Sequence, residues 1–263
     1  MFGKVANVVS RSVAAHPLVW FFSLAYLGSW TAILWMLLLD GPDQLMAVFG
    51  MSPLVAALIT QRVAQGNWRA FRVAGPWRRT LASTVVGIAS VTLAFVILPA
   101  VLVVDVGRLN WSALGSVSLL FSTSPLAGPL PEEPAWRGFA LPLLEAEYGA
   151  TRGSLILGVL WATWHLPLFL VPGFSSASFL TFVLIVLGHS TLLAFATNLA
   201  RFSVIPAIAM HWVFNNSSAV ISSLLANVEP SRELPFELVM GLCGLVVALG
   251  VIVVTKGKLA YKH

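Results

Sequence analysis

The sequence contains almost no cysteine and little charge. Cys243 is the single cysteine among 263 residues, which excludes a disulfide framework and a cysteine-based zinc site within one chain. Charged residues make up 10% of the chain, whereas a soluble domain carries about a quarter. Because 58% of the residues are hydrophobic, the chain is predicted to be one integral membrane domain over residues 1–263.

Signals for cleavage and for nucleic-acid binding are also missing. Lys4 and Arg11 precede the apolar run Pro17–Leu39, which is too long for a signal-peptide core and is not followed by a small-residue cleavage site. We therefore expect a retained first span. The net charge of +5 comes from basic residues in short loops between apolar runs, so the expected partner is the lipid bilayer and not nucleic acid.

Eight apolar segments are long enough to cross a membrane, at about 20 residues each. They lie near residues 17–39, 44–64, 80–104, 111–130, 152–172, 177–199, 203–226 and 234–255. Pro125, Gly128 and Pro129 interrupt the fourth segment, and the following stretch 131–148 is itself helix-like, so one of these two is expected to be a partial or tilted helix. The predicted fold class is an all-α, polytopic transmembrane bundle of about eight helices.

The distribution of basic residues predicts the orientation of this bundle. With the N-terminus inside, twelve basic residues fall in inner segments and only Arg108 and Arg232 in outer loops. The inner residues are Lys4, Arg11, Arg62, Arg69, Arg72, Arg78, Arg79, Arg152, Arg201, Lys256, Lys258 and Lys262. The positive-inside rule therefore predicts cytoplasmic N- and C-termini, and we expect a multi-pass protein of the bacterial plasma membrane.

Two adjacent carboxylates stand out in a chain that keeps its charge at segment ends. Glu132 and Glu133 follow Pro131 directly after an apolar stretch, and a carboxylate near hydrocarbon is costly unless it is paired or faces a wet cavity. An acidic first turn of a helix is the structural interpretation. In the functional interpretation Glu133 pairs with Arg137 at i,i+4 spacing, which leaves Glu132 free to act as a base.

Three of the five histidines lie inside apolar segments. His165 follows Trp161 by four residues, and His211 precedes Asn215 by four, so each pair shares a helical face. Trp161 is expected to stack on His165 or to form a wall of a pocket. His189 has no partner at helical spacing, and a structural role is assigned to it.

Together these residue types are what amide hydrolysis by an activated water needs. A carboxylate takes a proton from water, and a histidine orients that water or binds a metal. A second histidine and an asparagine can stabilise the oxyanion of the tetrahedral intermediate.

The three motifs, in this order, are similar to those of the CPBP family of intramembrane proteases, which includes the type II CAAX prenyl endopeptidases and bacteriocin-processing and immunity-type proteins. Glu132-Glu133-Pro-Ala-Trp-Arg137 resembles the first motif, Trp161-Ala-Thr-Trp-His165 the second and His211-Trp-Val-Phe-Asn215 the third. The resemblance covers about residues 120–220, the expected catalytic core. Trp161 stands where the family usually has phenylalanine, which affects the shape of the pocket.

The resemblance implies an endopeptidase that cleaves membrane-associated peptides or proteins, lipidated ones included. It implies Glu132 as the general base, His165 as the residue that positions the water, and His211 with Asn215 as the oxyanion hole. Glu133, Arg137 and Trp161 would support these four. The family has been described both as zinc-dependent and as metal-free, and Glu132, His165 and His211 could bind zinc. The chain has no HExxH motif, and no obligate metal is expected.

Two alternatives come from other functional classes. One is a non-catalytic membrane scaffold or bacteriocin-immunity factor on the same fold. The other is a proton-coupled transporter, because chains of Glu and His also relay protons in membranes. A transporter predicts two related halves, and no such repeat is visible in the sequence.

Overall fold

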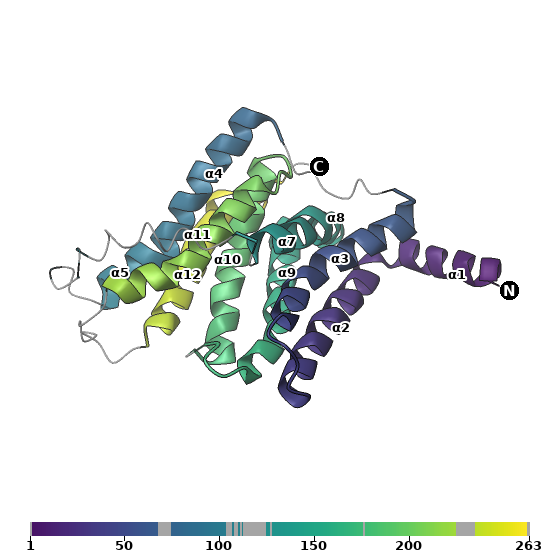
Figure 1. Ribbon diagram of the computed structural model, residues 1–263. Helices are drawn as coiled ribbons and strands as arrows, with labels where there is room; N and C mark the ends of the chain where they lie inside the picture. Colours follow the sequence, from purple (N-terminus) through teal and green to yellow (C-terminus); the bar gives the residue numbers. More distant parts are fainter. Residues whose placement is uncertain are drawn as a thin grey trace.

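The computed structural model describes residues 2–67, 75–103, 107, 110, 112, 125–126, 128–175, 177–224 and 235–261. All regular elements in these ranges are helices (Figure 1). In chain order they are α1 (Phe2–Ala15), α2 (Pro17–Leu38), α3 (Leu45–Gln65), α4 (Trp77–Thr92), η1 (Leu93–Ile97), α5 (Leu98–Val103), α7 (Pro129–Glu133), η4 (Pro134–Ala140), α8 (Leu141–Tyr148), α9 (Ala150–Trp164), η5 (Leu166–Leu170), α10 (Phe179–Leu199), α11 (Ile205–Leu224) and α12 (Phe236–Val254).

The predicted all-α membrane bundle is confirmed. Six stretches of the described chain are long and apolar enough to cross a membrane, namely 17–38, 45–65, 77–103, 150–170, 179–199 and 236–254. Each corresponds to a segment expected from the sequence, and α11 corresponds to a seventh, the predicted 203–226. The remaining predicted span, 111–130, lies mostly outside the described residues.

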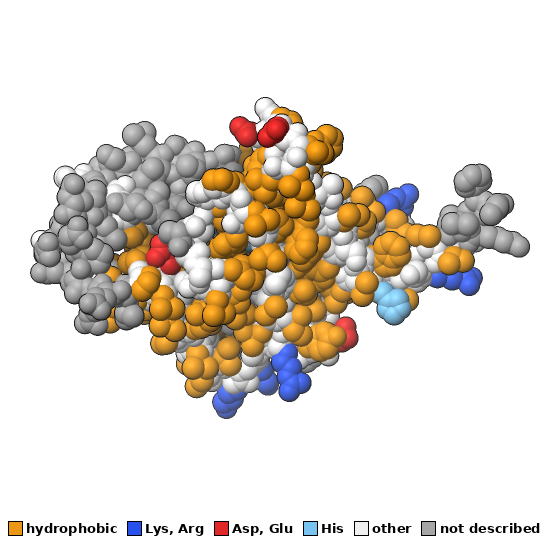
Figure 2. All heavy atoms as spheres, turned by 90° about the horizontal axis from the view of Figure 1, so that it is seen from below, with side chains coloured by type: hydrophobic (Ala, Val, Ile, Leu, Met, Phe, Trp, Pro, Cys, Tyr) orange, Lys and Arg blue, Asp and Glu red, His pale blue; other side chains and the backbone are white. Residues whose placement is uncertain are grey.

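The surface of the bundle is apolar over wide areas. Leu27, Leu38, Val246 and Val253 are each at least 66% exposed, and Figure 2 shows hydrophobic side chains over most of the visible face, with Lys and Arg side chains gathered at its edges. Exposed apolar area of this extent is unusual for a soluble monomer. The structure therefore fits a multi-pass integral membrane protein.

Three local features differ from the simple pattern of spans. Helix α1 precedes the first span and projects from the side of the bundle (Figure 1), a helix that the sequence reading did not predict. The predicted span 152–172 is an α-helix only as far as Trp164 and continues as the 3₁₀ turn η5. Pro167 explains this break, because proline lacks the N–H that an α-helix needs.

The third feature is the helix-like stretch 131–148, which is confirmed as a helix with a wide central turn. α7, η4 and α8 follow one another without a break, and η4 is a π-helix. Pro131 and Pro134 lie in or next to this turn, and π-helical turns occur frequently at functional sites. The two glutamates end α7 directly before it.

Helices α9 and α10 lie between two groups of helices. Figure 1 shows α2 and α3 on one side of this pair, and α4, α11 and α12 on the other. Trp164 Nε1 donates to Ser29 Oγ at 2.7 Å, and Ser29 Oγ donates to the carbonyl of Phe49 at 2.9 Å, so α9, α2 and α3 are connected. Ser190 Oγ of α10 donates to the carbonyl of Ser154 of α9 at 3.0 Å.

Candidate active site

Both glutamates are buried, so they do not belong to a solvent-exposed first turn of a helix. Glu132 is 5% exposed and Glu133 is fully buried. Pro129 and Pro131 begin α7, where their missing N–H groups cost no hydrogen bond. Because buried carboxylates need hydrogen-bond donors or a counter-charge, the donors around each glutamate indicate what it can do.

Glu133 is held by two cationic or protonatable groups through one oxygen. Arg137 Nη1 donates to Glu133 Oε1 at 3.2 Å, which is the ion pair predicted from the i,i+4 spacing. His211 Nδ1 lies 2.7 Å from the same oxygen. The guanidinium of Arg137 also lies 4.2 Å from the ring centre of Trp161, in the geometry of a cation–π contact. Glu133 therefore connects the first motif to the third.

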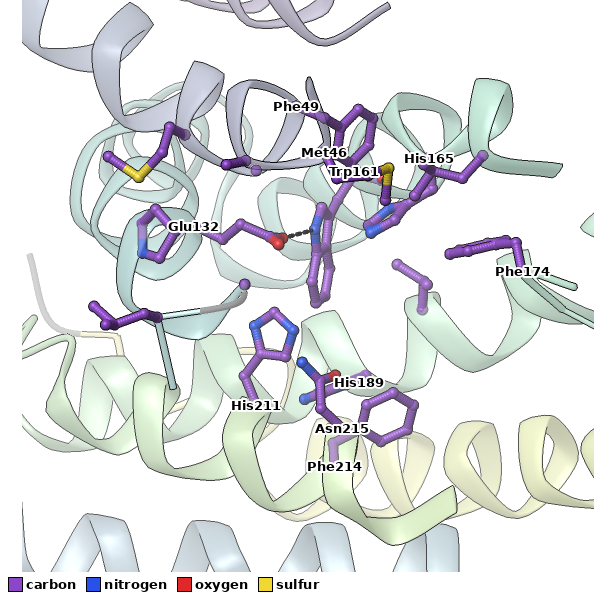
Figure 3. A pocket seen from close by; sticks show the side chains of 18 of the residues that line it. Met46, Phe49, Glu132, Trp161, His165, Phe174, His189, His211, Phe214 and Asn215 are labelled. Carbon is purple, nitrogen blue, oxygen red and sulfur yellow. Dashed lines mark hydrogen bonds between the residues drawn. The ribbon is translucent and has the colours of Figure 1, made fainter. Parts of the chain in front are cut away.

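Glu132 is held by two indole groups. Trp161 Nε1 donates to Glu132 Oε2 at 2.9 Å, which Figure 3 shows as a dashed line. Trp136 Nε1, one helical turn after Glu132, donates to the same oxygen at 3.3 Å. No basic side chain is within ion-pair distance of Glu132 among the described residues. Glu132 thus faces the cavity with one oxygen already hydrogen-bonded.

His165 lies at the C-terminal end of α9, where the helix breaks. Its Nδ1 lies 2.8 Å from the carbonyl oxygen of Trp161. Because a carbonyl oxygen only accepts hydrogen bonds, Nδ1 is the protonated ring nitrogen and donates a hydrogen bond to this oxygen. In the neutral ring Nε2 then has a free lone pair, which can accept a hydrogen bond from water. This geometry suits the orientation of an attacking water.

His211 and Asn215 lie one turn apart on α11 and both face the same cavity (Figure 3). Because Nδ1 of His211 donates to the carboxylate of Glu133, its Nε2 is a donor only when the ring is doubly protonated. The pair can then present an imidazolium N–H and an amide N–H to a developing oxyanion.

These side chains line one cavity of about 660 Å³. Glu132, Trp161, His165, His211 and Asn215 all contribute to its wall, although they come from α7, α9 and α11. The rest of the wall is mostly apolar and includes Met46, Phe49, Met51, Leu168, Phe174, Phe182 and Phe214. The structure therefore brings together the four residues that the sequence singled out for chemistry. Glu133 contacts one of them, His211, and Arg137 forms an ion pair with Glu133.

Two residues near the site were not assigned to it from the sequence. His189 of α10 also lines the cavity, and its ring centre lies 5.7 Å from those of both Trp161 and His211. Trp136 donates to Glu132, whereas its place within the first motif predicts no separate role for it. The i,i+4 spacing of Glu132 and Trp136 is a signal that could have identified this contact, whereas nothing in the local sequence relates His189 to His211.

A zinc ion held jointly by Glu132, His165 and His211 does not match this arrangement. In the described parts of the chain, no three His, Cys, Asp or Glu side chains are grouped closely enough to share an ion. The indole of Trp161 stands between the two imidazoles (Figure 3), with its ring centre 5.9 Å from that of His165 and 5.2 Å from that of His211. In this arrangement Glu132, His165 and His211 do not form a three-ligand site.

The segment of the chain that contains this site is similar to known proteins. Residues 114–217, which contain all three motifs, match the family described as Type II CAAX prenyl endopeptidase Rce1-like. A CAAX prenyl protease 2 of Methanococcus maripaludis is 28% identical over 99 residues, which cover 35% of this chain and 36% of that relative. The match thus spans about a third of the curated relative. The resemblance to type II CAAX prenyl endopeptidases is confirmed over this segment.

Proposed function

We propose that the protein is an intramembrane endopeptidase that hydrolyses peptide bonds of membrane-associated substrates with a water activated by Glu132. The observation that carries this proposal is the convergence of Glu132, His165, His211 and Asn215 on one cavity from three separate helices. The similarity of residues 114–217 to the type II CAAX prenyl endopeptidases supports the same reaction class.

In the proposed reaction Glu132 takes a proton from water while His165 Nε2 accepts a hydrogen bond from the same molecule. The resulting hydroxide adds to the carbonyl carbon of the scissile peptide bond. His211 and Asn215 stabilise the negative charge that develops on the carbonyl oxygen. Glu132 then returns the proton to the leaving nitrogen as the C–N bond breaks, which gives a carboxylate and an amine.

The supporting residues set the geometry and charge of this constellation. Glu133 orients His211 through the 2.7 Å contact with Nδ1, in the way that a carboxylate fixes an imidazole in other hydrolases. Arg137 balances the charge of the buried Glu133. Replacing either partner leaves an uncompensated buried charge, which is strongly destabilising.

The substrates that fit best carry a lipid or another apolar group next to the scissile bond. The cavity wall beside the polar residues is mostly apolar and includes several aromatic and methionine side chains, and methionine adapts its shape to flexible apolar ligands. The name of the archaeal relative states a prenyl substrate for that protein. We extend this substrate class to the present chain as part of the proposal.

The test is cleavage by the purified protein in liposomes, with prenylated and unmodified peptides as substrates and products identified by mass spectrometry. Glu132→Gln is expected to abolish cleavage. Glu147→Gln is the matched control, because Glu147 is an exposed carboxylate on α8, and it is expected to cleave as the wild type does.

The same assay separates the remaining functional classes. We expect cleavage to persist when a chelator removes divalent metals, and loss of activity that zinc restores would contradict the metal-free reaction. Cleavage by Glu132→Gln at the wild-type rate would exclude the proposed base. A cellular phenotype that survives replacement of Glu132, His165 and His211 together would favour the non-catalytic scaffold.

A further inference from the structure

Gly128 lines the cavity beside the atoms proposed to carry the reaction. It precedes α7 with φ of 115° and ψ of −77°. A Cβ atom at this position would be 3.2 Å from Glu132 Oε1, 3.4 Å from Asn215 Nδ2 and 4.0 Å from His211 Nε2. The proposed base and both proposed oxyanion donors therefore border the volume that any larger residue would fill.

Two of these atoms, Glu132 Oε1 and His211 Nε2, are left available for chemistry because the other polar atom of each side chain is already hydrogen-bonded. Glu132 Oε2 accepts from Trp161 Nε1 at 2.9 Å and from Trp136 Nε1 at 3.3 Å, so its lone pairs are engaged. Oε1 is the other oxygen and lies close to Gly128 at the cavity wall. His211 Nδ1 is likewise engaged by Glu133, so Nε2 is the ring nitrogen of His211 that lies near Gly128. In both side chains, the atom that is already hydrogen-bonded within the protein leaves the other atom available to a substrate or water.

We propose that the water and the scissile carbonyl meet in the part of the cavity that Gly128 lines, and that Glu132 acts through Oε1 because the two indoles hold Oε2. A reacting atom needs a position about 3 Å from both the base and the oxyanion donors, and glycine permits this close approach of backbone to substrate. Gly128, Trp136 and Trp161 are then positioning residues. This inference rests on the proposed function and specifies the place of the reaction.

Backbone strain alone would also require glycine at this position, because side chains rarely adopt a φ of 115°. Gly149 separates the two explanations. It has φ of 78° and ψ of 164°, equally restricted to glycine, but a Cβ there would meet nothing within 4 Å. Gly128→Ala and Gly149→Ala both strain a turn before a helix, and only Gly128→Ala fills the space beside the catalytic atoms.

The experiment compares kcat, KM and substrate binding in both alanine variants, with the thermal midpoint as a measure of folding. Gly128→Ala is expected to lower kcat by about 100-fold or more, the size of effect seen when one oxyanion contact is lost, while it still binds the prenylated peptide. Gly149→Ala is expected to retain the wild-type kcat. Equal kcat values in the two variants would overturn the inference.

A second pair of variants decides the question if Gly128→Ala does not fold. Trp161→Phe keeps an aromatic ring but removes the donor to Oε2, and it is expected to lower kcat by about 10-fold with KM unchanged, as for the loss of a hydrogen bond to a charged group. Trp20→Phe is its control, because Trp20 Nε1 donates to Ser12 Oγ, which does not line the cavity. A Trp136→Phe, Trp161→Phe double variant with wild-type kcat would contradict the role of the indoles.

These outcomes are distinguishable from failure of the proposed function itself. If Glu132→Gln cleaves like the wild type, the proposed reaction is wrong whatever Gly128→Ala does. If Glu132→Gln is inactive while Gly128→Ala and the double tryptophan variant are fully active, only the placement of the reaction at Gly128 is wrong.

Discussion

At the scale of single residues, the two adjacent glutamates differ in their donors and therefore in the roles open to them. Glu133 faces Arg137 and His211, whereas Glu132 accepts from two uncharged indole N–H groups. Uncharged donors hold the Glu132 carboxylate in place without forming an ion pair. The sequence predicted the pair of Glu133 and Arg137 from spacing alone, because both lie on one helix.

A third buried carboxylate lies away from the cavity and predicts a pH dependence of stability. Glu145 of α8, outside the candidate spans, is fully buried and accepts a hydrogen bond from Asn198 Nδ2 at 2.7 Å. Burial raises the pKa of Glu145 from 4.5 to about 8, and the hydrogen bond from Asn198 opposes this shift only in part. Between these two values the folded protein keeps a proton that the unfolded chain has released.

Stability is therefore expected to fall as the pH rises from about 4.5 toward 8, because the folded state binds more protons than the unfolded state over this range. Thermal unfolding in detergent at pH 5, 6.5 and 8 measures this fall. Glu145→Gln should reduce it, whereas Glu147→Gln, which alters an exposed carboxylate on the same helix, should not. The same pH slope in Glu145→Gln and the wild type would refute the assignment to Glu145.

At the scale of helices, small residues bring backbones together where α10 crosses α12. A Cβ on Gly188 would be 2.7 Å from the carbonyl carbon of Gly244, so the two helices touch through their backbones, as membrane helices commonly do at small residues. Phe95 of η1 packs against the other side of Gly244. This crossing holds His189, the residue after Gly188, beside the cavity.

Gly188→Ala is expected to destabilise the protein by about 1–3 kcal/mol, the usual effect of overpacking, because the obstructing atoms belong to the backbone of α12. Gly250→Ala on α12 is the control, since a Cβ there meets nothing within 4 Å, and alanine favours the helix by up to about 1 kcal/mol. The thermal midpoints of the two variants should therefore move in opposite directions. A midpoint for Gly188→Ala at or above that of the wild type would contradict the close crossing.

The helix that carries the glutamates shows what local sequence cannot supply. The stretch 131–148 was predicted to be helix-like, and α7, η4 and α8 confirm it. Its π-helical turn was not predicted, because proline spacing indicates an irregularity but not which hydrogen bonds replace the lost ones. The position of the turn sets which side chains of the first motif meet Trp161 and His211.

At the scale of the whole molecule, the orientation in the membrane stays a prediction. The basic residues place both termini in the cytoplasm. Reporter fusions at each terminus test this, and both are expected to be active only on the cytoplasmic side. A reporter in the loop 39–44, between α2 and α3, is the control and should lie outside. Termini on opposite sides would require an odd number of crossings and would contradict the predicted eight.

The sequence by itself determined the class of the protein and the positions of most spans. A chain with little charge and long apolar runs can adopt few folds, because a backbone in lipid must satisfy its own hydrogen bonds and does so here as helices. The predicted 17–39 and 177–199 therefore agree closely with α2 and α10. The sequence also predicted the i,i+4 pair of Glu133 and Arg137, because the geometry of a single helix places these residues on one face.

Only the tertiary structure decided which groups meet across helices. The donation from Trp161 to Glu132, the contact of His211 with Glu133 and the close approach of Asn215 to Gly128 join residues 29, 78 and 87 positions apart. Such contacts depend on how helices rotate and cross, and spacing along one helix carries no information about that rotation. The sequence therefore identified the groups proposed for hydrolysis, and the packing of α7, α9 and α11 placed them around one cavity.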